Sequence, residues 1–402
     1  MTKLEERLRR GMNRYSERIR PESLPPLREP SGRRPRRTVR WLAPVAAAAV
    51  VVGVIVGVSL AGQHTQRPSA LRTGGGATAT PVPPGPGMPP YYATVFQTYA
   101  GGGGNPLTKA EVLDSATGAE LKSLSVPTLF TQGGANGADI TAAANDRTFV
   151  IYETGTVSAR DRIAWFFLLR LAANGHSATL SRMRVSMPRA LAVDYVALSP
   201  NGRMLAMQEQ YCPNPGGCEY TGIRVVTIAT GAVRTWTTKE NGAPFNVSWA
   251  GNTRVAFLWE GPRLSGYRLM SLTGPGGSLL KASRSVASPS AEQSGYFPSA
   301  LVTADGRTVI TSTVSSGTGT ATAKIVELDA QTGKLLRVLY TVTGSATSLG
   351  EGCNVLSLGP VGIYLLVACP DFGRLDGSVF KPLPGFPSPS RSGVSQQSTG
   401  AW

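Results

Sequence analysis

The sequence predicts an all-β protein: a β-propeller of about six four-stranded blades, preceded by a short cytoplasmic helix and one transmembrane helix. Three observations lead to this prediction. Charged residues form only 16% of the 402 residues, while 47 glycines and 30 prolines indicate short strands joined by many turns. Polar turn motifs recur about every 50 residues, as in repeat architectures. One uncharged apolar run, long enough to cross a bilayer, precedes these repeats.

Residues 1–40 form a basic arm that we expect to lie in the cytoplasm. The arm holds 13 Lys and Arg against 5 Asp and Glu, so it carries +8 of the formal net charge of +16. Because this excess flanks an apolar run, a membrane explains it and no nucleic-acid partner is predicted. Apolar residues at helical spacing predict an amphipathic helix over 2–20: Leu4, Leu8, Met12, Tyr15 and Ile19. We expect this helix to contact the inner leaflet or a cytoplasmic protein partner.

Residues 41–61 are predicted to form the transmembrane helix and to contact the lipid bilayer. This run is uncharged, and its 21 residues cover roughly 31 Å, close to the thickness of a bilayer core. Five arginines precede it within residues 33–40, whereas only Arg67 and Arg72 follow closely. The bias predicts a single-pass protein of the cell membrane with its N-terminus in the cytoplasm and an extracytoplasmic C-terminal domain. A cleaved signal peptide is the alternative, although this apolar run exceeds the usual length.

Three segments complete the predicted organisation. Residues 62–90 are rich in Pro, Gly and Thr, which predicts an extended linker. Residues 91–384 contain the strands of the propeller. The Ser-rich residues 385–402 predict a disordered C-terminal tail.

Two series of polar turns alternate along residues 91–384. The first series has arginines spaced by 56, 51 and 53 residues: Asn145-Asp146-Arg147, Asn201-Gly202-Arg203, Asn252-Thr253-Arg254 and Asp305-Gly306-Arg307. The second series consists of Thr117-Gly118, Asn174-Gly175, Thr230-Gly231, Thr273-Gly274, Thr332-Gly333 and Asp376-Gly377. Two interleaved series imply four short strands in each unit, which is typical of propeller blades. Residues 91–96, YYATVF, stand where the first unit should have its polar turn. Seven blades or an open arrangement are the alternatives.

Four segments resemble the strand–turn–strand units of TolB-like and WD-repeat-like propellers: VALSPNGRMLA (196–206), VTADGRTVI (302–310), VLDSATGAEL (112–121) and VELDAQTGKLL (326–336). The whole layout resembles single-pass membrane proteins of actinobacteria that carry a propeller outside the membrane. The WD dipeptide and the GH signature of true WD repeats are missing. The resemblance therefore implies the fold and the topology, and little about the ligand.

The four cysteines all lie in the second half of the chain. Three pairings are possible, and the neighbours in sequence are the preferred disulfide partners, Cys212 with Cys218 and Cys353 with Cys369. Free structural thiols are the alternative. Neither His64 nor His176 stands at ligand spacing from the cysteines, so no zinc site is predicted there, and no metal ligand or cofactor is assigned.

Three glutamates repeat with the first series of turns. Glu153, Glu209 and Glu260 each follow a turn arginine by six residues, which predicts equivalent positions at the ends of three second strands. They are expected either to form an acidic patch at the propeller mouth, for a cationic ligand or metal, or to pair with neighbouring Arg or N–H groups. The loop Cys212–Cys218 follows on the same rim, flanked by Tyr211 and Tyr220, and we expect these side chains to contribute to binding.

Sequence signals for catalysis are weak. The chain has two histidines, and it contains no G-x-S-x-G, H-E-x-x-H or P-loop motif, so no catalytic residue is predicted and an enzyme is the less favoured class. The preferred function is an extracytoplasmic binding or scaffold module for a protein, peptide or envelope ligand. The alternatives are an envelope hydrolase that uses carboxylates at the propeller mouth, and a purely structural envelope protein.

Overall fold

The computed structural model divides the chain into two compact units, Met1–Gly74 and Gly75–Trp402. The residues that the structure describes all belong to the second unit: 88–98, 107–127, 135–158, 161–185, 191–214, 217–261, 266–287, 300–316, 319–345, 349, 353–359, 364–369, 372–383 and 396–401. The predicted helix over 2–20, the predicted span 41–61 and most of the linker lie outside them. Among these described residues, no helix is long and apolar enough to cross a membrane.

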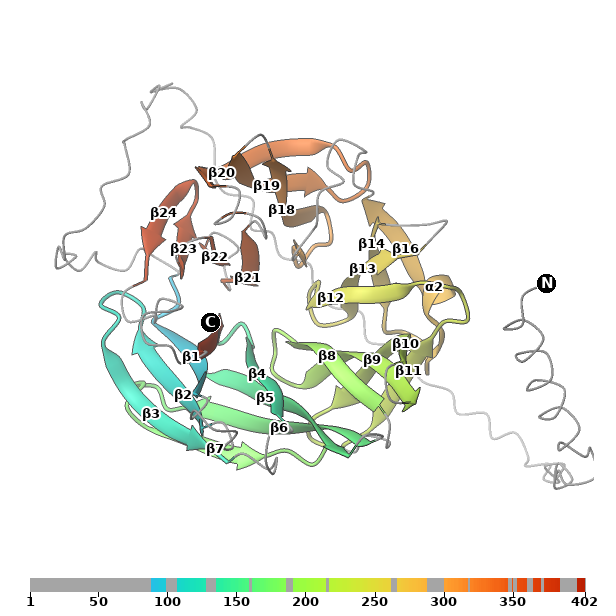
Figure 1. Cartoon of the computed structure of the whole chain (residues 1–402), viewed down its shortest axis with the longest axis horizontal. Helices are drawn as coiled ribbons and strands as arrows, with labels where there is room; N and C mark the ends of the chain where they lie inside the picture. Colours follow the sequence, from blue (N-terminus) through green and yellow to red (C-terminus); the bar gives the residue numbers. More distant parts are fainter. Residues whose placement is uncertain are drawn as a thin grey trace, which may run out of the picture. The chain divides into compact units, whose positions relative to one another are not determined.

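The described strands form an all-β propeller in which six sheets surround a common centre (Figure 1). Named from the inner strand outward, sheet 1 contains β25 (Gln396–Ala401), β1 (Tyr91–Thr98), β2 (Leu107–Asp114) and β3 (Glu120–Val126); sheet 2 contains β4 (Ala135–Ala142), β5 (Thr148–Ser158), β6 (Asp161–Leu171) and β7 (Ala178–Arg182); and sheet 3 contains β8 (Leu191–Leu198), β9 (Met204–Asn214), β10 (Gly217–Thr227), β11 (Val233–Thr237) and β15 (Gly277–Ser278).

The other three sheets have four strands each. Sheet 4 contains β12 (Ala243–Trp249), β13 (Arg254–Glu260), β14 (Gly266–Ser271) and β16 (Ser283–Ala287); sheet 5 contains β17 (Ala300–Val302), β18 (Thr308–Ser316), β19 (Thr320–Asp329) and β20 (Leu335–Ser345); and sheet 6 contains β21 (Asn354–Leu358), β22 (Tyr364–Ala368), β23 (Phe372–Asp376) and β24 (Val379–Pro382). One short helix, α2 (Leu279–Ala282), precedes β16. Sheet 3 departs from the predicted four strands because the two-residue β15 pairs with β11 in parallel.

Both series of turns are at their predicted places in the strand order. Turns of the first series join the first and second strands of sheets 2 to 5, and turns of the second series join the third and fourth strands. Because neighbouring strands are antiparallel, the two series share one face of the propeller. Asn145 shows the local chemistry: its side-chain oxygen accepts hydrogen bonds from the backbone N–H groups of Arg147 and Thr148.

The C-terminal segment corrects part of the prediction of a disordered tail over 385–402, whose residues 385–395 and Trp402 lie outside the described residues. Residues 396–401 form β25, which pairs antiparallel with β1 from Ala93↔Ala401 to Thr98↔Gln396. Without β25, the inner edge of β1 would expose a row of unpaired N–H and C=O groups. The partner strands come from opposite ends of the chain, so local composition could not reveal the pairing. This closure also explains why the first unit lacks a polar turn: its first strand comes from the C-terminus.

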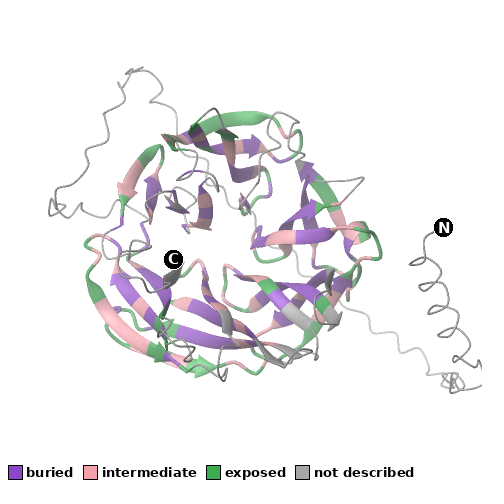
Figure 2. Cartoon of the chain, viewed as in Figure 1, coloured by how far each residue is buried: buried purple, intermediate pink, exposed green. Residues whose placement is uncertain are grey.

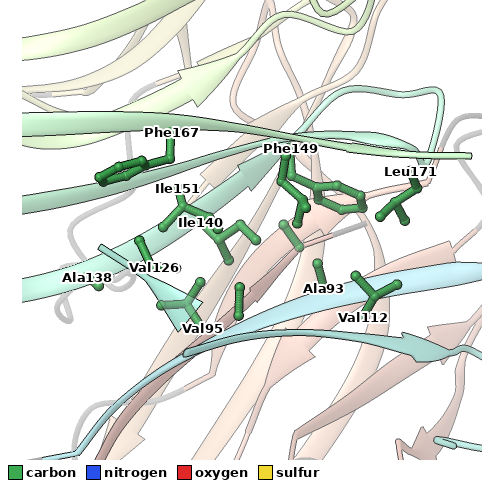
Figure 3. Close-up of a cluster of buried hydrophobic side chains, with 13 residues drawn as sticks. Ala93, Val95, Val112, Val126, Ala138, Ile140, Phe149, Ile151, Phe167 and Leu171 are labelled. Atoms are coloured by element: carbon green, nitrogen blue, oxygen red, sulfur yellow. The ribbon is translucent and has the colours of Figure 1, made fainter. Parts of the chain in front are cut away.

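The hydrophobic core is divided among the contacts between neighbouring sheets. One cluster of buried side chains joins each neighbouring pair, including sheets 6 and 1, so the ring of sheets is closed. Figure 3 shows the cluster between sheets 1 and 2, where Val95 and Val112 face Phe149 and Ile151. Alternate residues of one strand serve the two neighbouring clusters. The outermost strands, such as β7 and β20, are the most exposed (Figure 2).

One predicted disulfide is confirmed. Cys353 and Cys369 are bonded, and they flank the pair Asn354↔Ala368 that ends the β21–β22 ladder. The bond therefore joins the start of β21 to the end of β22. Cys212 lies in β9 and Cys218 in β10, on the two sides of the β9–β10 turn, and their side chains are outside the described part of the structure.

Candidate functional site

The centre of the propeller contains a cavity of about 620 Å³, which we call the central cavity. All six inner strands contribute to its wall, and β4, β8, β12 and β17 do so at the ends where they run into the first series of turns. The cavity therefore lies toward the face that carries the turns. The lining residues from the strands are Asp139, Ile140, Thr141, Ala142, Val196, Ala197, Leu198, Val247, Ser248, Trp249, Leu301, Val302, Leu356, Ser357, Leu358 and Ala401.

The described lining of the central cavity carries only negative charge. Asp139 and Asp305 are the only charged residues among the described residues that line the cavity, and most of the others are aliphatic or small. Several alanines and two glycines of the turns keep the wall thin, which leaves room at the centre. Ligand sites of this kind combine an apolar wall with a few placed polar groups. An acidic cavity of this composition suits an apolar molecule that carries a positive charge.

Asp139 is held in a fixed orientation on β4. One carboxylate oxygen accepts a hydrogen bond from its neighbour's backbone N–H, at Ile140, with a distance of 2.7 Å. The other accepts one from the Tyr152 hydroxyl at 2.9 Å. Burial, together with the negative charge of Asp139, raises the pKa of Tyr152 well above its usual value, so the phenol keeps its proton and remains a donor. Asp139 thus presents a carboxylate that a buried tyrosine orients.

Asp305 lies at the exposed edge of the cavity, in the turn between β17 and β18. Its carboxylate accepts hydrogen bonds from the Thr303 hydroxyl at 2.6 Å and from the Arg307 backbone N–H at 3.0 Å. The Thr303 bond is the main cause that holds the pKa of Asp305 below its usual value. Asp305 therefore carries its charge at neutral pH.

A bulge in β12 shapes another part of the wall. The register between β12 and β13 shifts between Phe245 and Ser248, and Asn246 between them has a φ of 50°. Ser248 is buried, lines the cavity, and has a hydroxyl without a hydrogen-bond partner among the described groups. A buried hydroxyl without a partner is uncommon in a folded protein, because a lost hydrogen bond costs free energy.

Hydrogen bonds between neighbouring sheets tie the wall and the rim of the cavity together. The Leu198 N–H donates to the Thr141 hydroxyl, and the Trp249 indole N–H donates to the Ala197 carbonyl. From turn to turn, donor and acceptor pairs are Ala144 N–H to Pro200 O, Asn201 N–H to the Asn252 side-chain oxygen, and the Arg254 guanidinium to Ala304 O. These bonds link sheets 2 to 5, so the cavity is preorganised before a ligand arrives.

The predicted glutamates do not line this cavity. Glu153, on β5, is completely buried, with 0% of its surface exposed, and the Thr108 hydroxyl of sheet 1 lies near its carboxyl group. Glu209 is also buried and forms an ion pair with Arg224 of the neighbouring strand β10. The two carboxyl groups are packed between sheets, away from any exposed surface at the mouth.

Glu260 differs from the other two, and the length of a turn explains the difference. Residues 250–253 join β12 to β13, and they are one fewer than residues 199–203, which join β8 to β9. A shift of one residue reverses the face on which every later side chain of a strand lies. Glu153 and Glu209 therefore face the preceding sheet, whereas Glu260 is exposed and lies on the face of β13 that packs against sheet 5. The three positions are not equivalent.

The predicted rim of tyrosines is only partly described. Tyr211, in β9, is exposed, at 43% of its surface. Tyr220 lies in β10 opposite Gln210. Tyr211 is not among the described residues that line the central cavity, and a binding role for either tyrosine remains a prediction.

The residues that matter for the cavity were not singled out from the sequence. Asp139 and Ser248 occupy inner strands whose sequences are mostly small or apolar, ANGADITA and APFNVSW, although each strand also contains an asparagine. A polar residue within such an inner strand was the available signal. Within the described residues, no group of three or more His, Cys, Asp or Glu side chains is placed to hold a metal ion.

Comparisons with known proteins do not assign this chain to a family. No protein-family model and no curated protein matches the sequence. Among solved structures, a puromycin hydrolase mutant is 14% identical with a TM-score of 0.37, over 61% of this chain and 36% of that one. Prolyl oligopeptidase B from Galerina marginata in its apo form is 13% identical with a TM-score of 0.38, over 62% and 32% of the two chains. The chain thus spans about a third of these proteins, and at such identity the likeness says nothing of activity.

Proposed function

We propose that the propeller is a binding module whose central cavity receives a positively charged group carried by an apolar molecule or by a partner peptide. The observation that carries this proposal is the lining: six inner strands form one cavity of about 620 Å³ whose only charged lining residues in the described structure are Asp139 and Asp305. An amine or a lysine side chain is the simplest chemistry that satisfies both parts of such a wall. We count each sheet as one blade, which makes the binding module six-bladed.

The affinity would arise from two contributions. An apolar group gains from leaving water for the aliphatic wall, at about 25 cal/mol per Å² of buried apolar surface. A charge-assisted hydrogen bond to the oriented carboxylate of Asp139 adds directional specificity. The hydrogen bonds around the rim reduce the entropy lost on binding, because the wall does not need to become ordered.

Matched probes test this proposal. Benzylamine and benzyl alcohol have similar shapes, and only the amine is charged at neutral pH, so calorimetric titration of the full chain in a non-ionic detergent should show tighter binding of the amine. Asp139→Asn should weaken benzylamine binding about tenfold, as expected for the loss of a charge-assisted contact. The same substitution should leave benzyl alcohol binding unchanged.

A control separates local from general charge. Glu120, on the outer strand β3, is exposed, so Glu120→Gln removes one negative charge at a distance from the cavity. Equal weakening by Glu120→Gln would contradict the proposed site. Equal loss of both probes in Asp139→Asn would indicate a structural role for Asp139 instead. Failure of both probes to bind would favour a purely structural envelope protein.

The hydrolase alternative receives less support from the cavity. Glycoside hydrolysis by two carboxyl groups needs one that keeps its proton, with a raised pKa. The pKa of Asp305 is lowered, so it is not suited to act as the general acid, and of the described lining residues only Asp139 is left for that role, whose two oxygens both accept hydrogen bonds.

We also propose that residues 41–61 anchor the module in the cell membrane, with the arm 1–40 in the cytoplasm and the propeller outside. The support is the uncharged run and the arginines that precede it. Protease treatment of intact cells, followed by detection of tags at both ends, tests the orientation. Cleavage of the propeller with protection of the arm is expected; protection of both ends in intact cells would contradict it.

A further inference from the structure

A second hollow lies on the outer part of the propeller, between sheets 2 and 3. This groove has a volume of about 490 Å³ and is lined on one side by β6, β7 and residues 183–185, and on the other by the end of β10 and the following turn. It shares no lining residue with the central cavity. β7 is the outermost strand of sheet 2, as the order β4-β5-β6-β7 shows (Figure 1).

The outer edge of β7 has free hydrogen-bonding capacity by its geometry. The Met183 N–H donates to the Phe166 carbonyl of β6 at 2.8 Å. Because the direction of N–H groups alternates along a strand, the amides of Leu180 and Arg182 point away from β6. An edge of this kind is a template for another extended chain.

The side chains from the last residue of β7 through residues 183–185, which follow it, alternate between basic and apolar. Met183 and Val185 pack toward sheet 3, beside the buried cluster that contains Leu168 and Val226. Arg182 and Arg184 lie on the alternate positions and are exposed. The guanidinium group of Arg182 stacks over the Trp165 ring at 3.8 Å, which fixes its plane and leaves its edge for an anion.

The positive charge of this edge is not compensated within the described structure. No described carboxylate forms an ion pair with Arg182 or Arg184, nor with Arg170 of β6, which also lines the groove. No acidic residue occurs among the described lining residues. The complementary partner is therefore acidic.

We propose that the edge strand β7 binds an extended segment of a partner protein in which acidic and apolar residues alternate. The segment adds to β7 as a further strand, its backbone pairing with the outward amides of Leu180 and Arg182. Its acidic side chains then lie opposite Arg182 and Arg184, and its apolar side chains opposite Met183 and Val185. A phosphate polymer would match the arginines but would gain nothing from the apolar side of the groove.

The experiment compares two labelled peptides of about eight residues, a usual strand length, with the same composition. One alternates Glu and Val, and the other has all Glu residues first and all Val residues last. Fluorescence anisotropy with the full chain in a non-ionic detergent should show that the alternating peptide binds and the block peptide does not. Added salt should weaken the binding. Hydrogen exchange should slow at the Leu180 and Arg182 amides when the alternating peptide is present.

Variants of the edge complete the test. The double substitution Arg182→Gln/Arg184→Gln should weaken binding of the alternating peptide about tenfold, because it removes two exposed ion pairs. Arg182→Lys/Arg184→Lys keeps the charges and should retain most of the binding, which also shows that the edge remains folded. Lys281→Gln/Arg284→Gln removes two exposed charges near sheet 4 and should have no effect. Equal binding of both peptides, competition by polyphosphate at equal strength, or unchanged exchange at Leu180 and Arg182 would each overturn the proposal.

Discussion

Glu153 predicts an unusual dependence of stability on pH. Its side chain is fully buried between sheets 1 and 2, and neither carboxylate oxygen has a hydrogen-bond partner of normal geometry among the described groups. Burial raises the pKa of Glu153 from 4.5 to about 7, although the nearby Thr108 hydroxyl offsets part of the rise. The folded protein therefore holds this proton far more tightly than the unfolded chain does.

The size and direction follow from linkage. A difference of about 2.5 pKa units corresponds to about 3 kcal/mol, at roughly 1.4 kcal/mol for each unit. Below about pH 4.5, the carboxyl group is protonated in both states and the full stability is present. As the pH rises through about 7, the unfolded chain gains from ionisation that the folded state resists, so the free energy of unfolding falls by about 3 kcal/mol.

The assay is urea unfolding of the full chain at pH 5 and pH 8, with Glu153→Gln as the variant. Glutamine is close in size and cannot ionise, so the variant should lose most of this pH dependence and be the more stable protein at pH 8. The difference between the free energies of unfolding of the two proteins isolates the effect of Glu153, because other groups such as Asp146 titrate in both. Glu120→Gln is the control and should keep the wild-type slope. A Glu153→Gln variant with an unchanged slope between pH 5 and pH 8 would refute the reasoning.

Three further predictions concern stability. Asp146 has a φ of 56° where the equivalent turns have Gly202 and Gly306, and burial raises the pKa of Asp146 to about 6. Asp146→Gly should therefore raise the free energy of unfolding at pH 8 by about 1 kcal/mol, measured by urea unfolding. A lower free energy of unfolding in the variant would contradict this. The Cys353–Cys369 bond closes a separation of 16 residues, so the double substitution Cys353→Ser/Cys369→Ser should lower the free energy of unfolding by about 3 kcal/mol. An unchanged free energy of unfolding would mean that the bond does not constrain the unfolded chain. Removal of residues 396–402 deletes β25 and its six pairs with β1, which should lower the free energy of unfolding by on the order of 3–6 kcal/mol. Amide hydrogen exchange should then become faster in β1 than in the other strands. An equal increase in all strands would argue against local closure by β25.

The repeats allowed the fold class to be predicted because turns have strong local chemistry. Asn, Asp and Gly stand where a side-chain oxygen or a positive φ is needed, as Asn145 and Gly202 show. Two such turns in each unit place four strands in order without any knowledge of the rest of the chain. The pairing of β25 with β1 could not be predicted this way, since it joins residues about 300 positions apart through backbone groups that any sequence carries.

A site on a propeller depends on the face of the strand on which each side chain lies. The exact length of the preceding turn sets that face, because one residue more or less reverses it. Counting from Arg254 places Glu260 in register with Glu209, yet a turn that is one residue shorter puts it on the opposite face of its strand. The residues that line the central cavity are hard to predict for a different reason. Asp139 and Ser248 become neighbours of one space only because every sheet directs its inner strand to the same centre. A polar residue in a mostly apolar inner strand is therefore a useful signal in such repeats, but Asp194 of β8 is also such a residue and does not line the cavity, so its place along the strand matters as well.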